Sequence, residues 1–499
     1  MRTLQTSLCV VFVAIALSFP RHVAQTSDAS SDELKPGQVI ERVVCKNSPE
    51  QTYALYLPSN YSANRRWPLV AAFDPGARGK APVERFKEAA ERYGYIVCGS
   101  NNSRNGPLAV SGDAAKAMLG DISSRFAIDE KRVYLTGFSG GARAATAIAV
   151  WLKGQVAGVI GCGAGLAQGI EPTPALPFVF YGTVGTEDFN YSEMKQLDRA
   201  LDSARVTHRI EVFAGGHSWA PVDVCVRAIE WMELQAIKSG LRPRDDSFID
   251  RLFIAARESA TAKESASQLY DAYTGYSQVA SDFKGVRDVA EFEKKAAQLK
   301  DSRAVKQAIN KERDQENEEL QRMKELFGLR AKLRTQATAA ALGEGGAYGG
   351  VNSQPEAAND PQTRQTFLSD LKHMLSDLKR KSDAKEASTE RAFARRVLNQ
   401  FTITLFEQSS SLIQRKRYEL AASNLAIDAE IMPDNWRVLY NLACAHALAG
   451  DKRRAIETLN RAVQKGFGNV SELENNRQLD AIREEAGFKK VIEGLKEKK

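Results

Sequence analysis

The expected fold is decided by the stretch Tyr134-Leu-Thr-Gly-Phe-Ser-Gly-Gly-Ala142, in which an apolar run leads directly into a serine flanked by glycines. The backbone around such a serine must turn sharply from strand to helix, and Gly137 and Gly141 remove the side chains that would collide there. A bare Gly-x-Ser-x-Gly pattern is weak evidence. The β-rich residues before it and the small residues after it make it strong, so the stretch predicts a nucleophile at Ser139.

Working outward, short apolar runs alternate with helical stretches from residue 39 to residue 236, the pattern of a mainly parallel sheet covered on both faces. We expect eight strands, at 39–45, 52–57, 68–73, 95–100, 132–137, 156–162, 178–182 and 207–213. Helices are expected between them, at 81–93, 112–126, 140–153, 192–204 and 222–238. Ser139 therefore follows the fifth strand.

This layout resembles the α/β-hydrolase fold, in which the nucleophile follows strand five, the acid strand seven and the histidine strand eight. The resemblance covers residues 38–238 and is closest to small secreted esterases of the dienelactone hydrolase, polyhydroxybutyrate depolymerase and feruloyl esterase type. It implies an α/β fold and a serine hydrolase that cleaves carboxylic esters through an acyl-serine intermediate. No cofactor is implied.

A catalytic serine needs a neighbouring base, and the chain has only five histidines. His22 lies in the N-terminal apolar region, and His373 and His446 lie in the helical half. His208 shares strand parity with apolar residues, which favours a place in the sheet. His217 remains, on the glycine-loosened loop after the eighth strand, and is the predicted general base.

The acid is expected after the seventh strand, where the segment Gly185-Thr-Glu-Asp188 resembles the acid loop of the family. The resemblance gives Asp188 the role of orienting the imidazole and stabilising its charged form. Glu187 is its immediate neighbour and the main rival, with a solvated loop charge as the alternative.

Acyl transfer also needs hydrogen-bond donors for the developing oxyanion. The N–H of Gly140, directly after the nucleophile, is one expected donor. The second should come from the turn after the third strand, where Gly76 and Ala77 are the candidates. This turn departs from the His-Gly-Gly-Gly form of lipases, and a plain tight turn is the alternative.

Residues 163–176, between strands six and seven, are few and proline-rich, which leaves no room for a large cap domain. We therefore expect an open site suited to bulky or polymer-attached esters. Asn101, Asn102 and Trp219 are candidate substrate-binding residues, with a structural role as the alternative for each.

The second half of the chain is expected to be all-α. Residues 239–338 form a charged helical segment, 339–362 a glycine- and proline-containing flexible linker, and 363–499 a helical domain. In that domain a pattern recurs at a 34-residue offset, which pairs Leu405 with Leu439, Ala421 with Ala455 and Leu425 with Leu459.

This spacing resembles the tetratricopeptide repeat, in which small residues let two antiparallel helices approach each other. Leu442, Ala443, Gly450 and Ala462 also fit the second unit. Two units are fewer than such arrays usually need, so we expect support from the preceding helices or from a terminal helix near 479–495. A generic helical hairpin is the alternative.

The first residues indicate targeting. Arg2 precedes an unbroken apolar run of ten residues, Leu8 to Leu17, which is too short to span a bilayer but suits a signal peptide covering residues 1–24. His22 fits a cleavage site poorly, so an uncleaved membrane anchor is the alternative. Either way, an exported protein, periplasmic or secreted, is expected.

Composition limits the remaining classes. A net charge of +7 in 499 residues, without a dense basic block, does not favour nucleic-acid binding. No His or Cys spacing matches a metal site. Four cysteines of the first domain either pair in an oxidising compartment or remain buried thiols, and the sequence does not choose. These residues are Cys45, Cys98, Cys162 and Cys225.

Three functions remain open. The first is an esterase whose tetratricopeptide-like tail contacts a protein partner or the hydrolase domain itself. The second is a serine peptidase on the same fold. The third is a catalytically inactive scaffold or binding protein that acts through its helices. Serine, histidine and acid at all three expected loop positions argue against the inactive form.

Overall fold

The computed structural model describes residues 34–343 and 361–497. The expected signal segment 1–24 lies outside these residues, as does most of the expected linker 339–362. Between residues 34 and 343 the chain forms one mixed sheet of eight strands followed by helices. No helix within the described ranges is both long and apolar enough to cross a membrane.

The sheet has the strand order β1-β2-β4-β3-β5-β6-β7-β8. The pairs β1/β2 and β2/β4 are antiparallel, and every later pair is parallel. The strands are β1 Val39–Cys45, β2 Ser48–Tyr56, β3 Trp67–Phe73, β4 Ile96–Ser100, β5 Ile128–Phe138, β6 Gly158–Cys162, β7 Val179–Gly185 and β8 His208–Phe213. This is the α/β-hydrolase arrangement, so the predicted fold class is confirmed.

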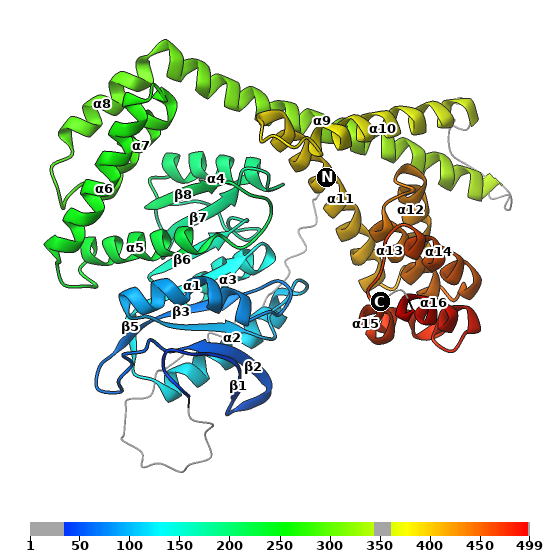
Figure 1. Cartoon of the computed structure of the whole chain (residues 1–499), viewed down its shortest axis with the longest axis horizontal. Helices are drawn as coiled ribbons and strands as arrows, with labels where there is room; N and C mark the ends of the chain where they lie inside the picture. The colour runs from blue at the N-terminus through cyan, green and yellow to red at the C-terminus, as the bar shows by residue number, and fades with distance from the viewer. Residues whose placement is uncertain (1–33, 344–360, 498–499) are drawn as a thin grey trace, which may run out of the picture.

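Helices cover both faces of the sheet (Figure 1). They are α1 Lys80–Tyr93, α2 Leu108–Arg125, α3 Gly140–Trp151, α4 Tyr191–Ser203 and α5 Val222–Lys238. Apolar residues of α1 and α5 share one core with the sheet, and those of α2, α3 and α4 share the other. The fifth strand begins at Ile128, earlier than expected. Its first residues are mostly charged, so a search for apolar runs does not detect them.

The rest of the described chain is helical, as expected for an all-α second half. Its α-helices are α6 Asp246–Ser265, α7 Leu269–Phe283, α8 Ala290–Asp301, α9 Arg303–Gly343, α10 Pro361–Ser382, α11 Thr389–Gln414, α12 Tyr418–Ile431, α13 Trp436–Leu448, α14 Lys452–Gln464, α15 Val470–Asn475 and α16 Ala486–Lys496. A short 3-10 helix, η2 Arg477–Ile482, precedes α16. Helix α9 continues into the expected linker because residues 339–342 are strong helix formers.

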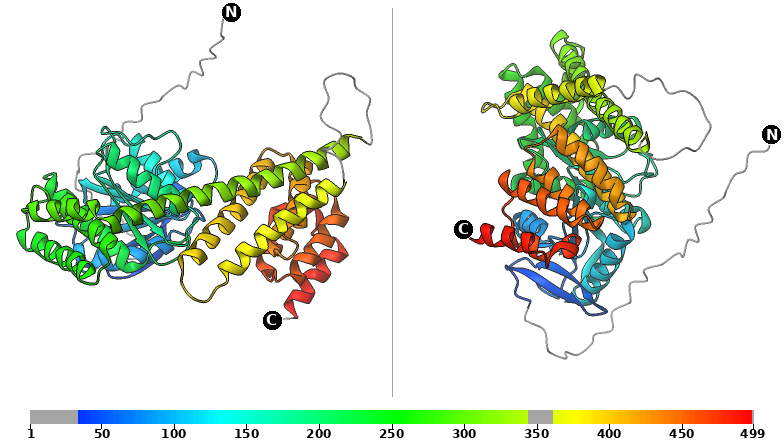
Figure 2. Two further views of the ribbon diagram at one scale, coloured as in Figure 1. Left: turned by 90° about the horizontal axis from the view of Figure 1, so that it is seen from above. Right: turned by 90° about the vertical axis from the view of Figure 1, so that its right-hand side faces the viewer.

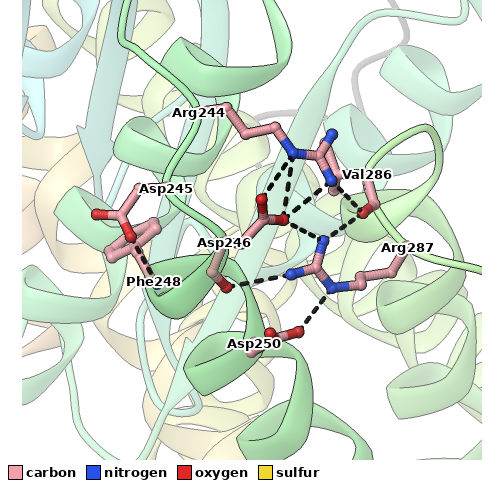
Figure 3. Close-up of polar contacts among 7 residues, drawn as sticks. All are labelled: Arg244, Asp245, Asp246, Phe248, Asp250, Val286 and Arg287. Carbon is pink, nitrogen blue, oxygen red and sulfur yellow. Dashed lines mark hydrogen bonds and ion pairs between the residues drawn. The ribbon is translucent and has the colours of Figure 1, made fainter.

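Helices α6, α7 and α8 pack against the end of α5 through a shared apolar cluster. Arginines fix the start of α6 against the loop before α8 (Figure 3). The Arg287 guanidinium donates to Asp250 over 2.7 Å and to Asp246 over 2.9 Å. Arg244 donates to the same Asp246 carboxylate over 3.0 Å.

Helix α9 then runs from this bundle past the α/β domain to the C-terminal helices (Figures 1 and 2). It contacts α4 directly, through Arg199 to Glu316 at 2.9 Å and Lys195 to Glu312 at 3.1 Å. Its later residues share an apolar cluster with α10 and α11. The long helix α9 therefore connects the α/β domain to the C-terminal helices.

The residues paired by the 34-residue pattern are buried, including Leu405, Leu439 and Leu459. Gly450 has a φ of 81° in the turn between α13 and α14, a conformation that favours glycine. Phe488 and Leu495 of α16 complete the same core, so the expected terminal support is present. Membership of the tetratricopeptide family stays a prediction.

The cysteines of the described residues are free thiols, all of them buried. They are Cys45, Cys98, Cys162, Cys225 and Cys444. Of the two expectations for the first domain, the unpaired one holds in this structure. Burial raises the pKa of the Cys45 thiol to about 11, so this thiol is protonated at neutral pH.

Candidate active site

Ser139 lies at the sharp turn between β5 and α3 with a φ of 53° and a ψ of −123°. L-residues seldom adopt a positive φ, so the conformation is strained and must be held by its surroundings. A Cβ on Gly137 would lie 2.1 Å from the Gly141 carbonyl oxygen, and one on Gly141 would lie 2.1 Å from the Phe73 carbonyl oxygen. Both glycines are therefore required by close backbone contacts, as the sequence predicted.

Asp188 and His217 form a hydrogen-bonded pair. The distance from His217 Nδ1 to Asp188 Oδ1 is 2.9 Å, and the carboxylate is fully buried while the imidazole is 19% exposed. The backbone N–H of Asn190 also donates to Asp188 Oδ1 over 2.8 Å. A carboxylate only accepts hydrogen bonds, so His217 Nδ1 is the donor of this bond and Nε2 is the ring nitrogen left for the serine.

Two aromatic rings enclose the His217 imidazole. The ring centroid of Phe138 lies 4.5 Å from that of His217, and that of Phe189 lies 4.1 Å away. Phe138 immediately precedes Ser139, and Phe189 immediately follows Asp188. The loops that carry the serine and the acid thus both contact the histidine.

Gly163, after β6, is the point on which these side chains converge. A Cβ there would lie 3.0 Å from the Phe138 ring, 3.1 Å from Asp188 Oδ2 and 3.2 Å from His217 Nδ1. The N–H of Ser139 donates over 2.8 Å to the carbonyl oxygen of Cys162, the residue before Gly163. Because β5, β6, β7 and β8 are adjacent parallel strands, the predicted serine, acid and histidine all follow the carboxyl ends of these strands, where Asp188 and His217 are in contact.

The rival acid, Glu187, points elsewhere. Its carboxylate pairs with Arg391 at 2.8 Å and with Arg395 at 2.6 Å, both on α11. Burial favours the neutral form of Glu187, but the hydrogen bonds from Arg395 and Arg391 outweigh it and hold the pKa of Glu187 below its usual value. Asp188 is the carboxylate that contacts the imidazole.

Of the expected oxyanion donors, Gly140 is the first residue of α3, where backbone N–H groups have no partner within the helix. The two candidates after β3 are already engaged inside their own turn. Gly76 donates to Asp74 Oδ1 over 2.8 Å, and Ala77, with a φ of 58°, donates to the Asp74 carbonyl oxygen over 3.2 Å.

Asn105 is a polar residue beside Gly140 that the sequence analysis did not predict as part of the site. A Cβ on Gly140 would lie only 1.9 Å from Asn105 Oδ1, so the exposed Asn105 amide lies directly against the start of α3. The backbone N–H of Asn105 donates to the Pro75 carbonyl oxygen over 2.9 Å. Its position depends on the loop after β4, whose path no local motif predicts.

The predicted substrate-binding residues make structural contacts. Trp219 is 6% exposed, and its indole N–H donates to buried Asp74 over 2.8 Å. The Asn101 amide binds Gly79 N–H and the Glu41 carbonyl oxygen, and the Asn102 amide binds Thr52 N–H and the Glu50 carbonyl oxygen.

These contacts brace β1 and β2 and the turn after β3. The protein itself occupies the polar groups of Trp219, Asn101 and Asn102, so the prediction that they line the substrate site gains no support.

Solved structures with a similar architecture include three bacterial and archaeal hydrolases. S-formylglutathione hydrolase from Staphylococcus aureus matches at 15% identity and a TM-score of 0.30, over 36% of this chain and 90% of that one. An esterase from Pyrobaculum calidifontis matches at 12% identity and a TM-score of 0.33, over 40% and 87%. Dienelactone hydrolase from Anabaena variabilis matches at 15% identity and a TM-score of 0.30, over 39% and 97%.

No protein-family model matches the chain, and no curated protein matches it either. The sheet order and the place of the serine turn after β5 are those of the α/β-hydrolase fold.

Proposed function

We propose that the chain is a serine hydrolase that cleaves carboxylic esters through an acyl-serine intermediate. The observation that carries the proposal is the Asp188–His217 hydrogen bond of 2.9 Å, held over Gly163 beside the strained turn of Ser139. A strained nucleophile turn next to an oriented imidazole and a buried carboxylate is the arrangement that activates a serine hydroxyl.

In the first half of the reaction Ser139 Oγ attacks the ester carbonyl carbon while His217 Nε2 takes the hydroxyl proton. Asp188 accepts the Nδ1–H bond and stabilises the imidazolium that forms. The carbonyl oxygen becomes an oxyanion. When the carbon–oxygen bond to the alcohol breaks, His217 returns its proton to the leaving oxygen, and the acyl group stays on Ser139.

In the second half water attacks the acyl carbon and gives a proton to the same Nε2. The bond to Ser139 Oγ breaks, the serine recovers its proton from His217, and the carboxylic acid leaves. No other reactant is required, because the two half-reactions together add one water across one ester bond.

For the oxyanion we propose the N–H of Gly140 and the side-chain amide of Asn105 as donors. The Asn105 side chain lies against Gly140, with Oδ1 nearest and Nδ2, its donor group, 3.6 Å from where a Cβ on Gly140 would lie. The N–H groups of Gly76 and Ala77, in contrast, already donate to Asp74. Gly76 and Ala77 remain candidates only if that turn rearranges when substrate binds.

The size of the proposed ester is argued from residues 163–178, between β6 and β7, which contain neither helix nor strand. An insertion that forms a cap is therefore absent at this place in the described chain. Bulky or polymer-attached acyl groups suit such an edge.

The test uses a fluorophosphonate probe and short-chain aryl esters on the purified protein. Wild type should be labelled and should turn over the esters, whereas Ser139→Ala should do neither. His217→Gln should lose labelling, and His208→Gln is its matched control, because His208 also contacts a carboxylate, that of Asp198 at 3.1 Å, but away from Ser139. Absence of labelling in wild type contradicts the proposal.

Two further proposals rest on the sequence alone. Export is proposed from residues 1–24, and N-terminal sequencing of the mature protein tests whether the segment is removed. A protein partner is proposed for the helical region from its tetratricopeptide-like spacing.

A further inference from the structure

Three arginines of α11 hold the loop that carries the acid of the candidate triad. Arg391 and Arg395 both donate to the Glu187 carboxylate, at 2.8 and 2.6 Å. Arg396 donates to the carbonyl oxygen of Thr186 over 2.8 Å. Glu187 and Thr186 immediately precede Asp188, so the helical half contacts the backbone and side chain next to the catalytic carboxylate.

The geometry of α11 places these arginines together. Arg391 and Arg395 are one helical turn apart and lie on the same face. The helix begins beside the loop because Ser388 caps it, its hydroxyl accepting the N–H of Arg391 over 3.1 Å. Arg395 also donates to the Ser382 carbonyl oxygen over 2.8 Å, which fastens the connection between α10 and α11.

The contact continues into the start of α4. The Arg396 guanidinium lies 4.7 Å from the centre of the Tyr191 ring and also pairs with Glu319 of α9. The same Glu319 accepts a hydrogen bond of 2.6 Å from Ser192. Arg396 and Glu319 are only 5% and 6% exposed.

Separating Arg396 from Glu319 would leave an uncompensated charge in the interior, which is costly. The two side chains, and the helices that carry them, are therefore held together. Residues 186–192 are thus attached to the helical half at Thr186, Glu187, Tyr191 and Ser192. The residues between these attachments face the other way. Asp188 binds His217, Phe189 packs on its imidazole at 4.1 Å, and the Asn190 amide donates to the Gly163 carbonyl oxygen over 2.7 Å. Residues 186–192 therefore have contacts both to the helical half and to His217 and Gly163. A shift of the contacts to the helical half would also move Asp188.

We propose that Arg391, Arg395 and Arg396 are positioning residues that set the orientation of the Asp188–His217 pair, so that the C-terminal helices are an integral part of the catalytic unit. This inference rests on the proposed function, because it assigns the helical half a role in the same triad. It predicts that weakening the contact at Glu187 slows the chemistry without weakening the binding of substrate.

The experiment compares Glu187→Gln, Arg391→Gln and Arg395→Gln in the full chain, with Arg415→Gln as the matched control. Arg415 is an exposed arginine at the opposite end of α11. Misplacing a catalytic group by a change outside the site is costly, so we expect kcat on an aryl ester to fall about tenfold or more with KM nearly unchanged. The control should keep wild-type kinetics.

Three further measurements separate positioning from general damage. Arg395→Lys should recover part of the lost kcat. Combining Glu187→Gln with Arg395→Gln should cost little more than either alone, because both remove one interaction. Hydrogen exchange should rise in residues 186–192 and stay unchanged in β5 and α3.

Wild-type kcat in a folded Glu187→Gln or Arg395→Gln variant, or unchanged exchange in residues 186–192, would overturn the inference. Failure of the proposed function is distinguishable, because it appears as unlabelled wild-type protein. The exchange measurement needs no activity, so it tests the attachment of the loop in either case.

Discussion

The indole N–H of Trp219 donates a hydrogen bond of 2.8 Å to Oδ2 of Asp74 and so joins the loop after β8 to the turn after β3. Asp74 is fully buried and also accepts from Arg78 over 2.8 Å. Burial favours the neutral carboxyl, but the bonds from Arg78, Trp219 and Gly76 outweigh it and lower the pKa of Asp74. The histidine loop and the expected oxyanion turn are therefore anchored to one charged group.

Replacing Trp219 with Phe should destabilise the protein without removing the triad. The variant leaves a buried carboxylate oxygen short of one donor, which costs about 1–3 kcal/mol in the free energy of unfolding. Urea denaturation followed by circular dichroism measures this cost. Trp151→Phe is the control, because Trp151 is 51% exposed and should change stability by less than about 0.5 kcal/mol. Equal stability of the two variants contradicts the prediction.

Gly163→Ala should reduce activity much more than Gly169→Ala. Both glycines have a positive φ, 64° and 83°, so both variants carry similar backbone strain of about 1–2 kcal/mol. An added Cβ at Gly163 meets Phe138, Asp188 and His217 at 3.0–3.2 Å, whereas at Gly169 it meets nothing within 4 Å. Steady-state kinetics and thermal melting of the two proteins check the prediction, which fails if kcat falls equally in both.

Asn105→Ala should lower kcat by about 10²–10³ with little effect on KM, the usual cost of losing one oxyanion donor. Asn105→Asp should be at least as slow, because a carboxylate of the same shape accepts hydrogen bonds and repels the developing negative charge. Kinetics on an aryl ester measure both. If Asn105→Ala keeps wild-type kcat, the second donor is a backbone N–H after β3.

Acid should release the acid loop from α11. The pKa of Glu187 is lowered in the folded protein below its ordinary 4.5, so the pairing stabilises the fold fully above that value and is lost as the pH falls through the lowered pKa. Wild type should therefore lose its stability advantage over Glu187→Gln as the pH drops from about 6 toward the acid range. Thermal melting of both proteins across that range gives the comparison. A constant difference would show that the pairing does not depend on the charge of Glu187.

The sequence predicted the sheet and its helices because most strands contain a local apolar run and several of the turns contain glycine. The nucleophile turn is the clearest case: Gly137 and Gly141 are needed for backbone contacts within a few residues of Ser139 or with the adjacent β3. Asp188 and His217 were predicted from their positions after the seventh and eighth strands. These strands are adjacent and parallel, so the residues that follow them lie close together.

What the sequence did not indicate depends on contacts between distant segments. The sequence around Arg391 does not predict an ion pair with Glu187, because the two residues are 204 positions apart and each resembles an ordinary surface charge. Asn105 lies in a loop without a recognisable motif, and only the three-dimensional structure shows that it contacts the start of α3. Trp219 was a candidate substrate-binding residue with a structural role as the alternative, and its indole N–H donates to buried Asp74.

The same separation of 204 residues fixes an order of events during synthesis. The ribosome completes β8 and α5, and with them the whole sheet, long before it reaches Arg391. The nascent α/β domain can thus complete its sheet while residues 186–192 still lack their partners on α11. A chain that ends between α5 and α11 should therefore contain the complete sheet and still lack the arginine contacts to residues 186–192.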